Sequence, residues 1–257
     1  MNDDLKAAIY AAKCAGKFVR DNYETTKTIS VKGKHDFATN VDIEAERIIF
    51  NALKPHGYSF LGEESGETSS SNKKQWIVDP IDGTSNYICG IPFFAISIGL
   101  MSGNKLVLGV VYDPLRDECY WAHKGSGSYL NGQKLRVSNT LKFGESFVLI
   151  EHGRSDKAIE KYIELTKHLM TKKGTAIMRQ GSTALMLCYV AKGSSPAFIS
   201  YGDELYDYVA GLLIAEEAGA KVTDWVGQQW NNSSSYILAS TPSVQDEIID
   251  RVKLLQS

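Results

Sequence analysis

The sequence predicts a mixed α/β protein whose two halves are built differently. From residue 93 to residue 137, short β-prone runs alternate with turn sequences such as Asn131-Gly132, a pattern typical of an antiparallel meander. After about residue 145, strand patterns and helix patterns alternate to the end of the chain. We therefore expect an α+β half over residues 1–145 and an α/β half over residues 146–257. The lack of a low-complexity linker favours their packing as one body.

Two helices and a loop are expected at the start of the chain. Apolar residues at helical spacing predict an amphipathic helix over residues 3–21. A second helix is expected to begin near Thr39, because Thr39 and Asp42 form a variant of the capping box, and to end before Pro55. The basic, glycine-bearing segment 29–36 between the two helices is expected to be a loop.

The second half is expected to alternate strands and helices. Its periodicity predicts strands near residues 147–151, 176–178, 197–200, 221–223 and 236–239. It also predicts helices over about residues 155–170, 182–191, 205–218 and 243–255. Asp203 can cap the helix that begins near Glu204, and Gly219 would end that helix.

The bulk composition favours a small-molecule partner over nucleic acid or a membrane. With 257 residues, of which 43% are hydrophobic, the chain can bury a full core. Its net charge of −2 and its pI near 6.2 give no field that would gather nucleic acid or anionic lipid. No apolar run approaches the roughly 20 residues of a membrane helix, and the N-terminus lacks the layout of a signal peptide. We therefore expect a cytoplasmic protein.

The cysteines and histidines indicate which metals the chain could hold. The four cysteines form no Cys-x-x-Cys pair, and the five histidines show no spacing typical of zinc ligands. A metal site in this chain would therefore be assembled from carboxylates and carbonyls. Such a donor set suits Mg²⁺ or Mn²⁺ better than zinc or copper.

The most informative stretch runs from Trp76 to Thr84. A strand over residues 75–78 would carry Asp79 to the edge of a sheet, since Pro80 cannot donate a ladder hydrogen bond, and Asp82-Gly83 would then turn the chain. Backbone N–H groups at the start of the following short helix would face the same place as the two carboxylates. The stretch predicts a site where a hard metal ion and a phosphate meet, although Asp-Pro and Asp-Gly are also ordinary turn sequences.

Two further places carry acidic residues of interest. Glu63 and Glu64 follow another short apolar run, so that two strand ends would deliver carboxylates to one rim. Asp207 lies in the first turn of the helix expected from Glu204, where the helix dipole favours an ionised carboxylate. Simple helix capping would explain Asp207 equally well. Its mostly apolar surroundings in the sequence nevertheless suggest that it pairs with a positive group.

These motifs together resemble the inositol monophosphatase family of Mg²⁺-dependent, lithium-sensitive phosphatases. The residues that carry the resemblance are Gly62-Glu63-Glu64-Ser65, the stretch from Trp76 to Thr84, Gly181-Ser182-Thr183-Ala184 and the helix start from Asp207 to Gly211. The likeness covers nearly the whole chain. It implies a layered αβαβα sandwich and, as is usual in the family, a homodimer.

The resemblance also implies a set of metal ligands. Two to three Mg²⁺ ions per subunit are expected, with Mn²⁺ as a substitute. Glu63, Asp79 and the carbonyl of Ile81 are similar to the ligands of one ion, and Asp79, Asp82 and Asp207 to those of a second. A third, weaker ion would share Glu63. Two ions bridged by one carboxylate can activate a water and neutralise the leaving alkoxide during in-line displacement at phosphorus.

Further roles follow from the same resemblance. Thr84 is similar to the threonine that orients the nucleophilic water, and Asp42 to the aspartate that bonds to that threonine. Together with Glu63 they are the expected catalytic residues. The backbone N–H groups of Gly83 and Thr84 are expected to bind phosphate.

The residues expected to bind the alcohol part of the substrate depart from the family pattern. The family has a glutamate that bonds a ring hydroxyl and a tryptophan before the last metal-binding aspartate, whereas this chain has Ser200 and Tyr206. The candidate substrate-binding residues are Gly181, Ser182, Thr183, Ser200 and Glu204. Lys32 and Asp36 match a mobile loop that reaches over the metals in relatives, although Lys32 could also be an ordinary surface lysine.

The expected function is therefore that of a Mg²⁺-dependent phosphomonoesterase acting on a small polyol or sugar phosphate, with inositol 1-phosphate as the family default. Alternative substrates among relatives are fructose 1,6-bisphosphate, NADP(H), histidinol phosphate and 3′-phosphoadenosine 5′-phosphate. A different class of function is that of a regulatory binding partner of the transcription or ribosome machinery. A complete set of four acidic ligands favours an enzyme over a regulatory protein. In a protein that had lost its metal site, four carboxylates that repel one another would have no electrostatic reason to be kept.

Overall fold

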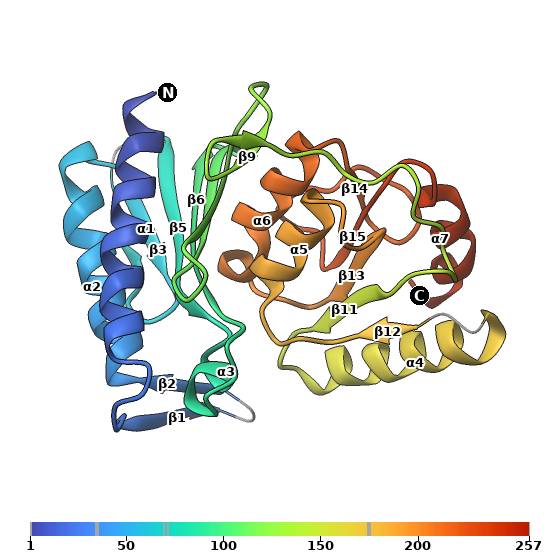
Figure 1. The fold of residues 1–257 in the computed structure, drawn as a ribbon, viewed down its shortest axis with the longest axis horizontal. Coiled ribbons are helices and arrows are strands. Elements are labelled where there is room, and N and C mark those ends of the chain that lie inside the picture. Colours follow the sequence, from blue (N-terminus) through green and yellow to red (C-terminus); the bar gives the residue numbers. More distant parts are fainter. Residues whose placement is uncertain (1, 34–35, 69, 71, 174–175, 257) are drawn as a thin grey trace.

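The computed structural model describes the whole chain except residues 1, 34–35, 69, 71, 174–175 and 257. Helical layers alternate with two β-sheets to give five layers, αβαβα, as the resemblance implies (Figure 1). The helices of the three layers are, in order, α1 (Asp3–Asp21) and α2 (Asn40–Leu53); α5 (Thr183–Ala191) and α6 (Leu205–Glu217); α4 (Asp156–Lys173) and α7 (Gln245–Val252).

The first helical layer begins and ends where the sequence indicates. The side chain of Asn2 caps α1 by accepting from Leu5 N at 2.8 Å. Thr39 and Asp42 form the predicted capping box at the start of α2, which ends in a short 3₁₀ turn, η1 (Lys54–His56). Both helices bury apolar faces against the larger sheet, so this layer closes one side of the core.

The prediction of a loop over residues 29–36 is wrong. The segment contributes to an antiparallel hairpin of β1 (Ile29–Gly33) and β2 (Asp36–Thr39). Every residue of β1 is exposed, so the strand has no buried face and its sequence shows no clear alternation of core and solvent positions. Backbone pairing with β2, rather than burial, holds it in place.

The larger sheet has eight strands in the order β10-β9-β8-β7-β6-β5-β3-β4. The predicted meander is present, since each strand from β6 to β10 pairs antiparallel with the next. The strands are β3 (Ser59–Gly62), β4 (Gly66–Thr68), β5 (Lys74–Asp82), β6 (Ala95–Ser102), β7 (Lys105–Asp113), β8 (Glu118–His123), β9 (Ser128–Leu130) and β10 (Gln133–Lys134).

Strand β5 is longer than expected. It continues past Val78 to Asp82, with irregular pairing to β6 between Asp79 and Asp82. Pro80 lies in that irregular section, where no ladder donor is required of it. The turn itself is made by Gly83, whose φ of 98° favours glycine, and the short helix α3 (Thr84–Ile88) follows.

The smaller sheet has five strands in the order β12-β11-β13-β15-β14. All the predicted elements of the second half are present, with ends shifted by a few residues. The last predicted helix is split into α7 and a 3₁₀ turn, η2 (Lys253–Leu255). The strands are β11 (Val148–His152), β12 (Ile177–Met178), β13 (Ala197–Tyr201), β14 (Lys221–Thr223) and β15 (Tyr236–Ser240).

The middle helices α5 and α6 join the two halves of the molecule. Helix α6 packs on β5, β6, β7 and β8 of the larger sheet, and both helices also contact strands of the smaller sheet. The large sheet takes its strands from residues 59–134 and the small sheet from residues 148–240, while a domain boundary at residue 145 stays a prediction. Within the described part of the chain, no helix is long and apolar enough to cross a bilayer.

Candidate active site

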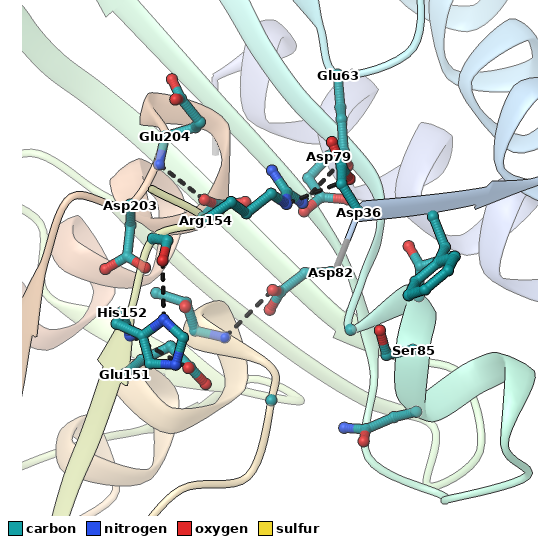
Figure 2. Close-up of a pocket in the computed structure, with 18 of the residues that line it drawn as sticks. Asp36, Glu63, Asp79, Asp82, Ser85, Glu151, His152, Arg154, Asp203 and Glu204 are labelled. Atoms are coloured by element: carbon teal, nitrogen blue, oxygen red, sulfur yellow. Dashed lines mark hydrogen bonds and ion pairs between the residues drawn. The ribbon is translucent and has the colours of Figure 1, made fainter. Parts of the chain in front are cut away.

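A cavity of about 490 Å³ lies between the two halves of the molecule (Figure 2). One wall comes from the start of β2, the ends of β3 and β5, and α3, and we call it the N-terminal wall. The other comes from the ends of β11 and β13, the segment before α5 and the start of α6, and we call it the C-terminal wall. The expected site residues on these walls are Asp36, Glu63, Asp79, Ile81, Asp82, Gly83, Thr84, Gly181, Thr183, Glu204 and Asp207.

The remaining expected site residues lie beside or behind these walls. Asp42, Ser182 and Ser200 are fully buried, so they meet other protein groups rather than the cavity. Lys32 lies on β1, and its Nζ contacts Glu63 at 3.3 Å and Glu64 at 2.6 Å. Lys32 is therefore not an isolated surface lysine.

The pairing of β3 with β5 places Glu63 beside Asp79. The two strands are parallel, with Gly62 opposite Val78, so the residues that follow them emerge at the same sheet edge. The N–H of Glu63 donates to the carbonyl of Val78 at 3.1 Å. Asp79 Oδ1 accepts from Ile81 N at 2.9 Å, which fixes the carboxylate across Pro80.

Asp82 is held by the start of helix α5. Its Oδ2 accepts from the Ser182 hydroxyl at 2.5 Å and from Ala184 N at 2.8 Å, and its Oδ1 accepts from Thr183 N at 3.2 Å. Burial raises the pKa of Asp82 to about 7, and these hydrogen bonds limit the rise. The Ser182 side chain thus orients an acidic group of the site, while the contact of its backbone with substrate that the resemblance implies stays a prediction.

Thr84 and Asp42 form the hydrogen bond that the resemblance implies. Thr84 Oγ1 lies 2.9 Å from Asp42 Oδ1 and 2.9 Å from the carbonyl oxygen of Ile81. Asp42 Oδ2 accepts from Thr39 N at 2.8 Å. Burial raises the pKa of Asp42, and the hydrogen bonds from Thr39 and Thr84 oppose that rise. The hydroxyl is thereby fixed between two acceptors at the cavity wall.

The carboxylates of the site repel one another. Burial, followed by the charges of Glu63, Asp82 and Asp207, raises the pKa of Asp79 well above its usual range. Burial and the charge of Asp203 likewise raise the pKa of Asp207, while Arg154 opposes the rise. Such a cluster requires positive charge at its centre to be ionised at neutral pH.

Arg154 supplies part of that charge. Figure 2 shows it reaching from the C-terminal wall toward Glu63 and Asp36. Arg154 Nη2 lies 3.1 Å from Glu63 Oε1, and Arg154 Nε lies 3.2 Å from Asp36 Oδ1. Burial lowers its pKa, but the charges of Asp207, Glu63 and Asp36 outweigh burial and raise it. Its charge also favours the ionised form of Asp207, as expected of a positive neighbour, although its ion pairs are with Glu63 and Asp36.

The donor set is suited to a hard cation, although it is not arranged as a finished metal shell. Among the residues that the structure describes, no group of three or more His, Cys, Asp or Glu side chains has that arrangement. Glu63 instead pairs with Lys32 and Arg154. The available donors around Asp79 are all oxygen atoms, which is the ligand type that Mg²⁺ and Mn²⁺ prefer.

The start of helix α6 differs from the expected capping. Glu204, rather than Asp203, is the N-cap residue, and its N–H donates to Asp207 Oδ2 at 2.8 Å. Because the helix begins one residue later than an Asp203 cap requires, the Asp203 side chain belongs to the C-terminal wall instead. Burial raises the pKa of Asp203 to about 7.

Sequence reasoning missed three charged residues of the C-terminal wall, namely Glu151, Arg154 and Arg179. Glu151 is the last buried residue of β11, and Arg179 Nε donates a hydrogen bond to its carboxylate. None of the three belongs to a motif. The one available signal was Glu151, which follows an apolar run within a predicted strand. An acidic residue that is buried is usually paired, so its position indicated a positively charged partner.

Comparison with known proteins identifies the family. The model of the inositol monophosphatase family matches residues 1–256. Inositol monophosphatase 1 of Solanum lycopersicum is 35% identical over 264 residues, covering 99% of this chain and 96% of the relative. Nus factor SuhB of Escherichia coli strain K12 is 35% identical over 269 residues, covering 98% of this chain and 100% of the relative.

Solved structures agree in fold. The IMPase of Thermotoga maritima superposes with a TM-score of 0.88 at 30% identity, covering 99% of this chain and 98% of that one. The MJ0109 gene product, described as an inositol monophosphatase-fructose 1,6 bisphosphatase, has a TM-score of 0.79 at 28% identity and covers 99% and 100%. The chain belongs to the inositol monophosphatase family. It is a phosphatase.

Proposed function

We propose that this phosphatase is a Mg²⁺-dependent phosphomonoesterase that hydrolyses a small polyol or sugar phosphate, with inositol 1-phosphate as the default substrate. The observation that carries the proposal is the convergence of Asp79, Asp82 and Asp207 with Glu63 on a cavity whose wall also presents the Thr84 hydroxyl bonded to Asp42. Family membership and the similarity to inositol monophosphatase 1 of Solanum lycopersicum support the same chemistry.

The proposed metal ligands are those that the resemblance implies. Glu63, Asp79 and the carbonyl of Ile81 would hold one divalent ion, and Asp79, Asp82 and Asp207 a second, with a third sharing Glu63. Bound divalent ions would lower the pKa of an attacking water and offset the charge that develops on the phosphate ester. Inhibition by lithium is expected on the same family grounds, and Mn²⁺ is expected to substitute.

The chain's own residues would orient the reaction. When Thr84 Oγ1 donates to Asp42 Oδ1, its lone pairs are directed away from Asp42 and can accept a hydrogen bond from the attacking water. Asp42 is in turn fixed by Thr39, so the hydroxyl has little freedom to rotate. Gly83 and Thr84 would bind phosphate oxygens at the same wall, and Lys32 and Asp36 would close over them from the β1–β2 hairpin.

Phosphate release with Mg²⁺ tests the proposal. Inositol 1-phosphate should be hydrolysed in Mg²⁺ and not in EDTA. The same assay on fructose 1,6-bisphosphate, NADP(H), histidinol phosphate and 3′-phosphoadenosine 5′-phosphate separates the alternatives, of which the bisphosphate is supported by the description of the MJ0109 product. Absence of Mg²⁺-dependent release from every ester would contradict the proposal.

A second candidate function is regulatory binding to the transcription machinery. The observation that favours it is the 35% identity to the E. coli protein described as Nus factor SuhB. The variant Asp82→Asn separates the two, because it removes a proposed metal ligand from the cavity wall. A biological activity that survives in cells after phosphate release is abolished would support the binding role.

We also propose a homodimer, as is usual in the family. Light scattering of the purified protein should give about twice the chain mass of 28.4 kDa. A mass equal to one chain at micromolar concentration would contradict the dimer.

A further inference from the structure

The C-terminal wall carries a buried carboxylate whose hydrogen bonding is incomplete. The Glu151 side chain is 6% exposed and lines the cavity. Its Oε1 accepts from Arg179 Nε and from His152 N, the latter at 3.1 Å. Its Oε2 is buried and has no hydrogen-bond partner among the described residues. A buried carboxylate oxygen without a donor is unfavourable, so a hydroxyl entering the cavity would complete this group.

The position of Glu151 relates it to the site where this chain departs from its family. In the parallel pairing of β11 with β13, Glu151 lies directly opposite Ser200. Ser200 has no charge and no exposed surface, so it does not reach the cavity. Strand β11 therefore places the Glu151 carboxylate next to Ser200, on the neighbouring strand of the sheet. An added Cβ at Gly153 would lie 1.7 Å from the carbonyl oxygen of Gly202, so the two strand ends stay this close only with glycine.

Arg179 gives the pair a donor beside the acceptor. Its side chain is 45% exposed, and only its Nε is engaged by Glu151. The guanidinium therefore has further N–H groups that a ligand oxygen can approach from the cavity. An acceptor and a donor held side by side match two neighbouring hydroxyls, one donating and one accepting.

The charges around this pair disfavour a second phosphate on the substrate. The same wall carries the carboxylates of Asp203 and Glu204, while Arg154 is already paired with Glu63 and Asp36. A second phosphate on the substrate would therefore face an excess of negative charge. A neutral polyol meets no such penalty.

We infer that the Glu151–Arg179 pair recognises a vicinal diol on the alcohol part of the substrate, with Glu151 accepting from one hydroxyl and Arg179 donating to the next. This inference rests on the proposed function and narrows it to monophosphate esters of neutral polyols. Glu151 and Arg179 are substrate-binding residues in this scheme and take no part in the reaction at phosphorus.

The variant Glu151→Gln tests the inference with two substrates. Inositol 1-phosphate offers vicinal hydroxyls, whereas p-nitrophenyl phosphate has none. KM for inositol 1-phosphate should rise by about tenfold or more, because a hydrogen bond to a charged group is lost, while kcat changes little. Both constants for p-nitrophenyl phosphate should stay within about twofold. The control variant Glu160→Gln makes the same chemical change at an exposed position of α4 and should alter neither substrate.

The variant Arg179→Gln gives a second measurement should Glu151→Gln fail to fold, since the Arg179 side chain is half exposed. It should also raise KM for inositol 1-phosphate selectively. Three results would overturn the inference and leave the proposed function intact. These are equal effects on both substrates, no effect of either variant, and faster turnover of fructose 1,6-bisphosphate than of inositol 1-phosphate. If the wild-type protein released no phosphate from either ester in Mg²⁺, the proposed function would fail, and the inference with it.

Discussion

The two walls of the cavity hold their charged groups in different ways. On the N-terminal wall, backbone N–H groups hold two of the carboxylates: Ile81 N bonds Asp79, and Thr183 N and Ala184 N at the start of α5 bond Asp82. On the C-terminal wall, long side chains pair with one another, as in the Arg179–Glu151 contact. Only substitution to proline removes a backbone donor, whereas almost any substitution changes a paired side chain.

This difference assigns the two walls to different tasks. Phosphate chemistry needs groups held within a fraction of an ångström, which backbone hydrogen bonds at helix and strand ends provide. Recognition of the alcohol part of a substrate needs only a complementary pattern of donors and acceptors, which a few side chains can supply. Substitutions on the N-terminal wall should therefore affect turnover, and those on the C-terminal wall should affect selectivity or metal dependence.

The largest effect is expected for Asp79→Asn on the N-terminal wall. The change removes the proposed shared ligand of two metal ions, so kcat/KM should fall by at least about 10³-fold, since charge stabilisation at such a centre is worth several kcal/mol. Phosphate release measures the loss. The exposed α7 residue offers the control Asp246→Asn, which should retain full activity. A variant that kept a tenth of the activity would remove Asp79 from the catalytic centre.

A smaller loss is expected for Thr84→Val, which keeps the shape of the side chain and removes its hydroxyl. Without the group that Asp42 orients, kcat should fall by about 10²-fold with KM nearly unchanged, as for other proton-transfer groups. Thr84→Ser restores a hydroxyl at the same position and should recover most of the rate. If serine and valine were equally slow, the hydroxyl would have no role in turnover.

The variant Arg154→Gln tests the contrast between the two walls, because the Arg154 side chain extends from the C-terminal wall and pairs with Glu63 and Asp36. Its ion pairs with Glu63 and Asp36 are partly exposed and worth roughly 1 kcal/mol or less, so the Mg²⁺ concentration for half-maximal activity should fall by about two- to fivefold. In EDTA the thermal midpoint should also decrease. Arg47→Gln, which removes a surface pair with Glu44, should change neither quantity. An unchanged Mg²⁺ requirement in Arg154→Gln would show that Arg154 does not compete for the site.

The sequence was most informative where a residue lies next to a turn or cap with its own chemical signature. Asp82-Gly83 and the Thr39 capping box have such signatures, and the structure places both as expected, whereas β5 continues through Pro80 instead of ending before it. Glu151 and Arg179 lie on separate segments with no local signature, and only the parallel pairing of β11 with its neighbours brings them together. The hairpin of β1 and β2 escaped prediction because its residues have no buried face to create a periodic pattern.

The smallest effect is expected from pH in the metal-free protein. Burial raises the pKa of Asp82, Asp203 and Glu64 to about 7 in the folded state, whereas unfolded carboxyls titrate near about 4. The folded protein therefore binds more protons between these values. This contribution to stability is fully present below about pH 4 and is lost as the pH rises through about 7. In EDTA, the thermal midpoint should decrease from pH 5 to pH 8, and saturating Mg²⁺ should weaken the trend. A midpoint that rose over this range would contradict these pKa shifts.

Crystals grown with Mn²⁺ would test directly whether Asp79, Asp82, Asp207 and Glu63 share divalent ions. Anomalous scattering should show two peaks, each within about 2.2 Å of an Asp79 oxygen, with one of them also bonded by Asp82 and Asp207. Arg154 should then have moved away from Glu63. Peaks that avoid Asp79 at saturating Mn²⁺, or an Asp207 carboxylate outside bonding distance of every peak, would contradict the proposed metal-dependent mechanism.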